Sequence, residues 1–220
     1  MQASEILALA SRAGIGPGVS VLDLCCGGGG PARLIARELG CTYLGVDASA
    51  GAVRLARRRS GGDCRFEVSR VPSVPAGPFD VVLLLETMLA FPDKPTLLRA
   101  VSSVLGPGGR FAFTLEEGQA LTAAERALMP AAHTVWPTPI GDLTACLART
   151  GFRVTWQREC TRSHQATADA LHRAFLAEAD VIRGQVGDHP LDDLLAGHRL
   201  WSDWLLEGRV RKFALVATKQ

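Results

Sequence analysis

A run of four glycines, Gly27 to Gly30, stands between a short apolar stretch and a segment with helical spacing. Residues 19–24 are mostly aliphatic and predict a buried strand, whereas residues 31–39 predict a helix with one apolar side. Glycines in such a loop let the backbone approach a ligand closely, and the helix N-terminus presents unpaired N–H groups to it. This order predicts the start of a βαβ unit that binds a nucleotide-like ligand.

Two acidic residues accompany the glycine loop. Asp47 lies 20 residues after Gly27, at the end of a second predicted strand over 42–47. This spacing suits a carboxylate that accepts hydrogen bonds from the ribose hydroxyls of an adenosine cofactor, although the same side chain could instead cap the following helix. Asp23, in the first strand, would also face the ligand. A carboxylate there would lie close to the pyrophosphate of a dinucleotide, whereas it can attract the ammonium group of an amino acid–nucleoside.

The glycine stretch alone leaves a second cofactor open. Residues 27–32 fit G-x-G-x-x-A, the looser form of the dinucleotide fingerprint. An NAD(P)-dependent dehydrogenase is therefore an alternative, and the rest of the chain must distinguish between the two cofactors.

The elements that position these residues alternate along the chain. Strands are predicted at 19–24, 42–47, 64–68, 79–85, 110–115, 152–157 and 210–217, with helices between most of them. Such alternation predicts an α/β fold with a mostly parallel sheet covered on both faces. Residues 160–208 break the pattern with two candidate helices and no convincing strand, so we expect a helical insertion inside a single domain that spans residues 1–220.

Composition excludes several partners. The 220 residues include 24 basic and 22 acidic side chains, a net charge of only +2, which gives no electrostatic reason to expect nucleic acid. The longest aliphatic run, residues 81–85, is far too short to cross a membrane, and the N-terminus is a poor signal peptide. Six cysteines without Cys-x-x-Cys spacing argue against a zinc site and against a disulfide scaffold, and favour reduced thiols in the cytoplasm. The only protein partner we consider is a second copy, in a homodimer.

Four motifs together carry a family resemblance. They resemble, in order, motif I, the second motif, the fourth-strand motif and the fifth-strand signature of the class I S-adenosylmethionine-dependent methyltransferases, and they stand at residues 21–30, 44–47, 79–82 and 105–113. The resemblance covers roughly residues 15–160. It implies a Rossmann-like, doubly wound seven-stranded sheet with an antiparallel last strand, a helical insertion between strands six and seven, and S-adenosylmethionine as cofactor, released as S-adenosylhomocysteine.

The resemblance also implies which residues bind the cofactor. Asp23, Gly27, Gly29 and Asp47 match the family's positions, while Cys25 stands where the family usually has Gly and Ser69, followed by Arg70, stands where many members have Asp. Ala48 and Leu85 would also line the cofactor.

The acceptor of the methyl group is less well defined. Acceptor-side residues should come from the ends of strands four and five, including Glu86, and from the inserted helices. We expect catalytic roles for Glu116, His133 and His164, and substrate contacts from Met88, Trp136, His172 and Trp201. The inserted helices would cover a small acceptor and exclude water.

The expected reaction is methyl transfer to a nitrogen, oxygen or carbon atom of a small molecule. The high Ala, Arg and Gly content is typical of a GC-rich actinobacterial genome and favours specialised metabolism. Two alternatives keep the fold but not the reaction: a non-methylating reaction such as cyclisation, and a non-catalytic protein that binds the cofactor.

Overall fold

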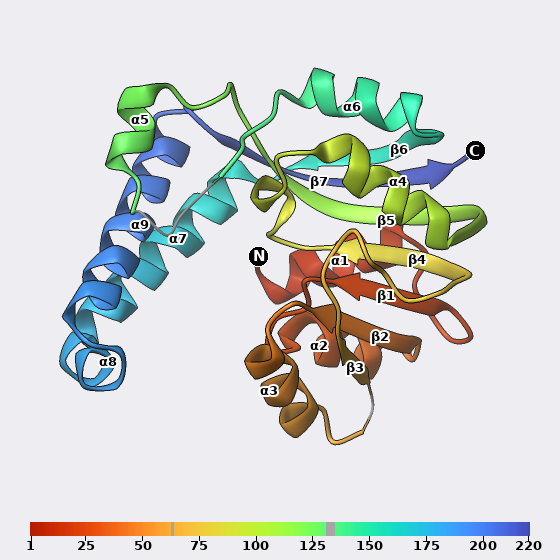
Figure 1. The fold of residues 1–220 in the computed structure, drawn as a ribbon, viewed down its shortest axis with the longest axis horizontal. Coiled ribbons are helices and arrows are strands. Elements are labelled where there is room, and N and C mark those ends of the chain that lie inside the picture. The colour runs from red at the N-terminus through yellow and green to blue at the C-terminus, as the bar shows by residue number, and fades with distance from the viewer. Residues whose placement is uncertain (63, 131–134) are drawn as a thin grey trace.

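A seven-stranded sheet runs through the molecule in the order β3-β2-β1-β4-β5-β7-β6 (Figure 1). The computed structural model describes residues 1–62, 64–130 and 135–220. The strands are β1 (Ser20–Leu24), β2 (Thr42–Asp47), β3 (Arg65–Val68), β4 (Phe79–Leu84), β5 (Leu105–Glu117), β6 (Phe152–Glu159) and β7 (Arg211–Lys219). The helices are α1 (Ala3–Arg12), α2 (Gly30–Leu39), α3 (Ala50–Ser60), the short 3₁₀ helix η1 (Met88–Ala90), α4 (Lys94–Val104), α5 (Ala123–Leu128), α6 (Ile140–Arg149), α7 (Thr161–Ala177), α8 (Ala179–Val186) and α9 (Asp188–Leu206).

The strand directions confirm the predicted fold class. β1, β2, β3, β4 and β5 pair in parallel, while β7 lies antiparallel between β5 and β6. Strand order reverses between β1 and β4, and ligands of open α/β sheets bind beyond the carboxyl ends of the strands at such a point.

Helices cover both faces of the sheet, as its strands require. On one face, Leu22, Leu24 and neighbouring strand residues pack with apolar residues of α4 and α6. On the other face, Val21 and Val81 pack with residues of α1, α2 and α3. A parallel strand buried on both sides reads as a continuous apolar run, which is why β4 was recognisable in the sequence.

The segment between β6 and β7 holds three helices, α7, α8 and α9, where the sequence predicted two. The first predicted helix is interrupted at Glu178, whose φ of −102° and ψ of 15° end α7 before α8 begins. α7 and α9 lie side by side and project beyond the edge of the sheet (Figure 1). β5 is also longer than the strand predicted at 110–115.

Candidate active site

The glycine loop between β1 and α2 has the open backbone that a close ligand approach requires. Gly27 has a φ of +53°, and a Cβ at this position would meet nothing within 4 Å. Gly29 has a φ of +73° and is the N-cap of α2, where a Cβ would lie 3.0 Å from the ring of Phe66. Only glycine adopts both positions without strain, so the loop fits its predicted role in cofactor binding.

Asp47 is fixed at the end of β2 by two backbone amides. The N–H of Gly27 donates to Oδ2 at 2.9 Å and the N–H of Ser49 donates to Oδ1 at 2.8 Å. The N-cap of α3 is Ser49, which accepts from the N–H of Ala52, so Asp47 does not cap that helix. Each carboxylate oxygen can accept a further hydrogen bond, and the position fits the predicted contact with ribose hydroxyls.

Asp23 is a buried acid at the same end of the sheet. Its side chain is almost fully shielded from solvent, and this burial raises the pKa to about 7. The nearby Tyr43 hydroxyl opposes the rise in pKa, whereas the charge of Asp47 adds to it. Two neighbouring acids with this electrostatic strain favour a cationic ligand, and S-adenosylmethionine carries both a sulfonium and an ammonium group. The site residues therefore fit this cofactor.

Cys25 adopts a left-handed backbone conformation with a φ of +58°. This geometry explains why glycine is the usual residue at the position. Burial, followed by the charge of Asp47, raises the pKa of the Cys25 thiol to about 11, and the pKa of the Cys26 thiol is raised to about 12. Both thiols are protonated at neutral pH and act as small loop residues rather than nucleophiles.

The remaining predicted cofactor residues lie around this end of the sheet. The Ser69 hydroxyl donates to the Ser73 carbonyl at 2.7 Å, and the Ser69 amide donates to the Asp47 carbonyl at 3.0 Å. Arg70 and Ala48 are exposed, and Leu85 is buried in the core.

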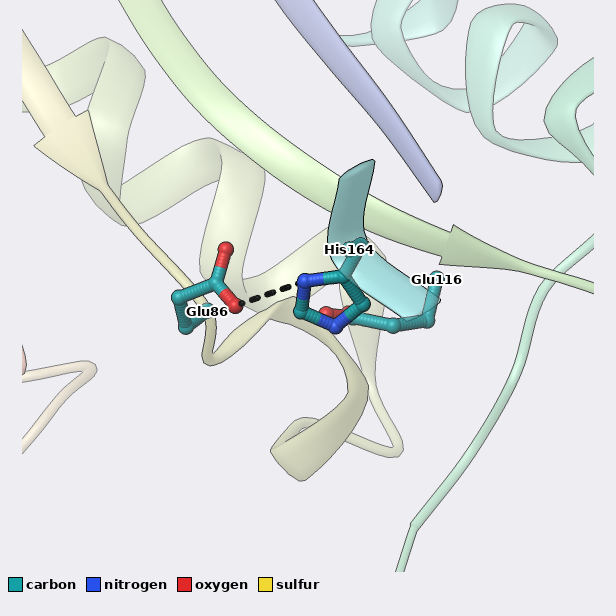
Figure 2. Close-up of side chains that lie close together, drawn as sticks. All are labelled: Glu86, Glu116 and His164. Atoms are coloured by element: carbon teal, nitrogen blue, oxygen red, sulfur yellow. Dashed lines mark ion pairs between the residues drawn. The ribbon is translucent and has the colours of Figure 1, made fainter. Parts of the chain in front are cut away.

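A second polar cluster gathers four charged or titratable side chains from distant segments: Glu86 after β4, Glu116 on β5, Lys212 on β7 and His164 on α7. Glu116 and Lys212 are register partners in the antiparallel pair, so their side chains point to the same face. The Lys212 ammonium lies 2.9 Å from Glu86 and in direct contact with Glu116. Nδ1 of His164 lies 3.6 Å from a carboxylate oxygen of Glu86 (Figure 2).

Glu86 is held in an uncommon backbone conformation that directs it into this cluster. Its φ is +61°, and its N–H donates to the Thr114 hydroxyl at 2.7 Å. Non-glycine residues in this region are stabilised by their surroundings and are frequent at functional sites.

Charges within the cluster set its protonation states. Desolvation opposes ionisation of Glu86, but Lys212 and the amino group of Met1 outweigh it and lower the Glu86 pKa to about 2. The pKa of Lys212 is raised, since the two carboxylates outweigh the desolvation that burial imposes. Burial, followed by the charge of Lys212, lowers the pKa of His164 to about 4. His164 is therefore an uncharged imidazole at neutral pH, next to an ion-paired lysine.

Two buried side-chain atoms in the cluster have no hydrogen-bond partner among the described residues: Oε2 of Glu116 and Nδ1 of His164. Ligand atoms of Glu86, Glu116 and His164 lie within 4.8 Å of one another, a spacing that a metal ion could use. The Lys212 ammonium already lies between the two carboxylates and supplies the positive charge that a metal would bring, so this donor set does not fit a resident metal.

The cluster forms the polar end of a cavity of about 390 Å³. Its described lining is Met1, Glu86, Leu89, Glu116, Val135, His164, Thr167, Ala168, Leu171, Gly197, His198 and Trp201. Most of these residues are apolar, and many belong to α7 and α9. The cavity thus lies between the end of the sheet and the inserted helices.

The structure brings three of the predicted acceptor-side residues together, since Glu116, His164 and Trp201 all line the cavity. Met88 is fully buried in the core and does not line it, and His172 and Trp136 are also absent from the described lining. The backbone of Trp136 instead donates to the Leu89 carbonyl at 2.8 Å. His133 lies outside the described residues.

Sequence reasoning missed Lys212. A lysine inside a strand that is otherwise buried is the signal that could have found it, because a buried ammonium needs carboxylate partners. The contributions of Thr167, Leu171 and His198 were missed as well, since helical spacing shows which residues share a face but not what that face covers.

Comparisons with known proteins agree with the fold and the motifs. The sequence matches the family described as "Methyltransferase domain" over residues 2–157. It is 34% identical over 111 residues to "Methyltransferase GfsG" of Streptomyces halstedii, which is 47% of this chain and 40% of that protein. The chain therefore covers less than half of this curated relative.

Solved structures share nearly the whole fold. A putative sarcosine dimethylglycine methyltransferase from Galdieria sulphuraria superposes with a TM-score of 0.85 at 14% identity, covering 99% of this chain and 84% of the other. The cyclopropane synthase MmaA2 from Mycobacterium tuberculosis superposes with a TM-score of 0.90 at 15% identity, covering 98% and 83%. At these identities the likeness concerns the fold alone.

The described part of the structure holds no helix long and apolar enough to cross a membrane. The family match spans the glycine loop, Asp47, β4 and β5, which are the elements that carried the predicted resemblance. The nicotinamide alternative is thereby set aside in favour of S-adenosylmethionine. The chain belongs to the family of methyltransferase domains.

Proposed function

We propose that this domain transfers a methyl group from S-adenosylmethionine to a small molecule bound in the cavity beneath α7 and α9. The observation that carries this proposal is the position of the cavity. Its polar end begins at Glu86, which follows β4 immediately after Leu85, and β4 is the direct neighbour of β1, from which the glycine loop leaves. A cofactor at the glycine loop and an acceptor in the cavity would therefore meet at the carboxyl ends of β1 and β4.

The cofactor residues hold the donor. S-adenosylmethionine would supply an activated methyl group on sulfur, and the chain has only to align it with the acceptor. Asp47 would accept hydrogen bonds from the ribose hydroxyls, and the open backbone at Gly27 would let the cofactor approach β1. The Asp23 carboxylate would balance the positive charge of the cofactor from its position on β1.

His164 is the side chain suited to receive the acceptor's proton. It lines the cavity, it is uncharged at neutral pH, and Glu86 lies beside its ring to stabilise the imidazolium that forms. A weak base suffices for this role, because an oxygen or nitrogen atom becomes far more acidic once it carries the transferred methyl group. Lys212 would hold both carboxylates in place by contacting Glu86 and Glu116.

The inserted helices would close the acceptor site. Ala168 and Leu171 on α7 and Trp201 on α9 contribute apolar walls that keep water from the transferring methyl group. We also assign the reaction to specialised metabolism on composition, and to a reducing compartment such as the cytoplasm because the six cysteines lack the spacing of a disulfide scaffold.

A second function keeps the cofactor but not the transfer. The low pKa of His164 makes it a poor base for a resting acceptor, which favours a reaction such as cyclisation in which the site stabilises charge. One solved neighbour on this fold, at 19% identity and a TM-score of 0.81, is the [4+2]-cyclase SpnF, so the fold accommodates ring formation. Turnover that consumes no S-adenosylmethionine while a substrate rearranges would favour this alternative.

Binding of the product cofactor tests the proposal directly. We expect S-adenosylhomocysteine to bind the wild-type protein in isothermal titration calorimetry, and NAD⁺ not to bind. Asp47→Ala should weaken S-adenosylhomocysteine about 10- to 100-fold, the loss expected for hydrogen bonds to a charged acceptor.

Asp142→Ala, an exposed acid on α6, is the matched control and should bind as the wild type does. Circular dichroism would establish that both variants are folded. Undiminished affinity in folded Asp47→Ala would contradict the assignment of the ribose contact, and absence of any S-adenosylhomocysteine binding would contradict the proposed function itself.

A further inference from the structure

The polar end of the acceptor cavity contains two buried polar atoms for which the described residues supply no hydrogen-bond partner, and one of them is a carboxylate oxygen. Glu116 is only 2% exposed, its Oε1 contacts Lys212, and its Oε2 has no partner. Nδ1 of His164 is likewise buried without a hydrogen bond. Leaving such atoms unsatisfied costs free energy, and a ligand that brings an O–H or N–H donor would recover part of it. Side-chain adjustments of the size common on binding would let the donor reach them.

The charge of the cavity disfavours an anionic acceptor. Two carboxylates, Glu86 and Glu116, lie at this end, both contact the Lys212 ammonium, and the Met1 amino group lies 3.8 Å from Glu86. No Lys or Arg side chain occurs in the described lining, so a phosphate or carboxylate on the acceptor would meet like charges without a free cation.

A cationic acceptor is disfavoured at the same place. An ammonium group at Oε2 of Glu116 would share that carboxylate with the fully buried Lys212, and the two like charges would repel each other in a poorly solvated site. The lowered pKa of His164 is consistent with this repulsion, since Lys212 and burial both oppose a second cation there.

The walls of the cavity suit a flat apolar molecule. Leu89, Val135 and Leu171 supply aliphatic surface, and Trp201 supplies an aromatic face. The Trp201 ring is anchored against Trp204, with ring centroids 5.8 Å apart, and Trp204 is itself buried. A rigid aromatic wall favours stacking with an aromatic ligand, and about 390 Å³ accommodates one or two fused rings with substituents.

We infer that the acceptor is an uncharged aromatic molecule that carries a hydroxyl group, and that this hydroxyl lies between Glu116 and His164, donating its single O–H to Oε2 of Glu116 in the resting complex and turning to His164 as the methyl group is transferred. This inference rests on the proposed methyl transfer and names its substrate class. In the reaction the hydroxyl oxygen forms a bond to the methyl carbon as the sulfur–methyl bond breaks, and the electron pair of that bond stays on sulfur. The O–H bond then breaks and its proton moves to His164, which leaves a neutral ether and neutral S-adenosylhomocysteine.

The test uses a matched panel of naphthalenes titrated calorimetrically into the protein saturated with S-adenosylhomocysteine at pH 7. 2-Naphthol carries the required donor, 2-methoxynaphthalene lacks it, 2-naphthoate is an anion and 2-naphthylmethylamine is a cation. We expect 2-naphthol to bind at least about 10-fold more tightly than each of the others, the ratio that corresponds to a single hydrogen bond to a charged group.

Two variants locate the recognition. Glu116→Gln replaces the carboxylate with an amide of the same shape and should reduce the preference for 2-naphthol over 2-methoxynaphthalene to less than about 3-fold. Trp201→Leu should weaken both neutral ligands about equally, whereas Trp156→Leu, on β6 and outside the described lining, should change neither. If Glu116→Gln does not fold, the Trp201→Leu result and the wild-type panel still decide the question.

The outcomes separate the substrate class from the proposed function. Equal or tighter binding of the anion, the cation or the methoxy compound would overturn the inference while S-adenosylhomocysteine binding keeps the proposed function intact. Failure of the wild type to bind S-adenosylhomocysteine would overturn both. A preference for 2-naphthol that Glu116→Gln abolishes supports the inference.

Discussion

Two acidic centres lie at the carboxyl ends of the strands: Asp23 with Asp47 is the first, and Glu86 with Glu116 is the second. They differ in how their negative charge is balanced. Asp23 and Asp47 form no ion pair with any described residue, and Asp47 is held by backbone amides. Glu86 and Glu116 instead share an internal cation, Lys212. A cationic ligand can therefore balance the negative charge of the first centre, whereas Lys212 already balances negative charge at the second. This contrast is why we assign the first to a cationic cofactor and the second to an uncharged acceptor.

Removing the internal cation is the strongest way to break this contrast. Lys212→Met should lower the free energy of unfolding by about 3–5 kcal/mol, because it leaves buried Glu116 without its partner. Chemical denaturation in urea measures the change. Arg211→Met, next to Lys212 on β7, removes an exposed ion pair with Glu117 of β5 and should cost less than about 1 kcal/mol.

The double variant Lys212→Met/Glu116→Met sharpens the same point. It removes both charges of the buried pair, and we expect it to be more stable than Lys212→Met alone. A double variant no more stable than the single one would show that the pair is not the source of the loss.

Asp23 should make the folded state less stable as the pH rises. Its folded pKa of about 7 exceeds the ordinary value of 3.8, so the folded state binds more protons and stability falls as pH rises from about 4 to 7. Asp23→Asn removes this loss, and the cofactor-free variant should be more stable than the wild type by on the order of 2–4 kcal/mol at pH 8. Thermal unfolding at pH 5 and pH 8 measures the difference, which should shrink at pH 5. The stabilised variant should also bind S-adenosylhomocysteine more weakly.

His164 gives a second pH signature, of the opposite sign. Its folded pKa of about 4 lies below the ordinary 6.5, so the unfolded state binds more protons and stability is lost as pH falls from about 6.5 towards 4. His164→Gln should flatten this part of the stability curve by about 1–3 kcal/mol. His172→Gln, on the same helix but outside the described lining of the cavity, is the control and should leave the curve unchanged. A titration of His164 near 6.5 by NMR would contradict the prediction.

The smallest effect concerns the loop at the first centre. Cys25→Val should destabilise the protein by about 1–2 kcal/mol, because a β-branched residue is strained at a φ of +58°. Cys25→Gly should change stability by less than about 1 kcal/mol, since relief of strain offsets the added freedom of the unfolded chain. Cys41→Val, outside the positive-φ positions, serves as the comparison in thermal unfolding. Equal melting temperatures for Cys25→Val and Cys25→Gly would exclude strain at this residue.

The two centres also differ in how far the sequence could predict them. The cofactor centre was recognisable because the glycine loop, Asp23 and Asp47 lie within one βαβ unit, where spacing along the chain sets spacing in the fold. The acceptor centre joins residues 86, 116, 164 and 212, so it depends on strand order and register that no local pattern contains. Glu116 and His164 were predicted as strand-end and lid candidates, but their contact with Lys212 follows only from β7 pairing antiparallel with β5. Helix number in the insertion was wrong for a similar reason, because the interruption at Glu178 has no glycine or proline to mark it.

The β6–β7 pair has a consequence for how such enzymes diversify. The N–H of Cys160 donates to the Lys212 carbonyl at 2.7 Å, so the helical insertion leaves and rejoins the sheet at adjacent points. Thermodynamically it is a long hairpin loop between strands that are already paired, and the entropy of closing such a loop grows only slowly with its length. Recombination could therefore exchange or resize residues 161–206 with little effect on sheet stability. The same sheet and cofactor site could then be combined with different acceptor cavities.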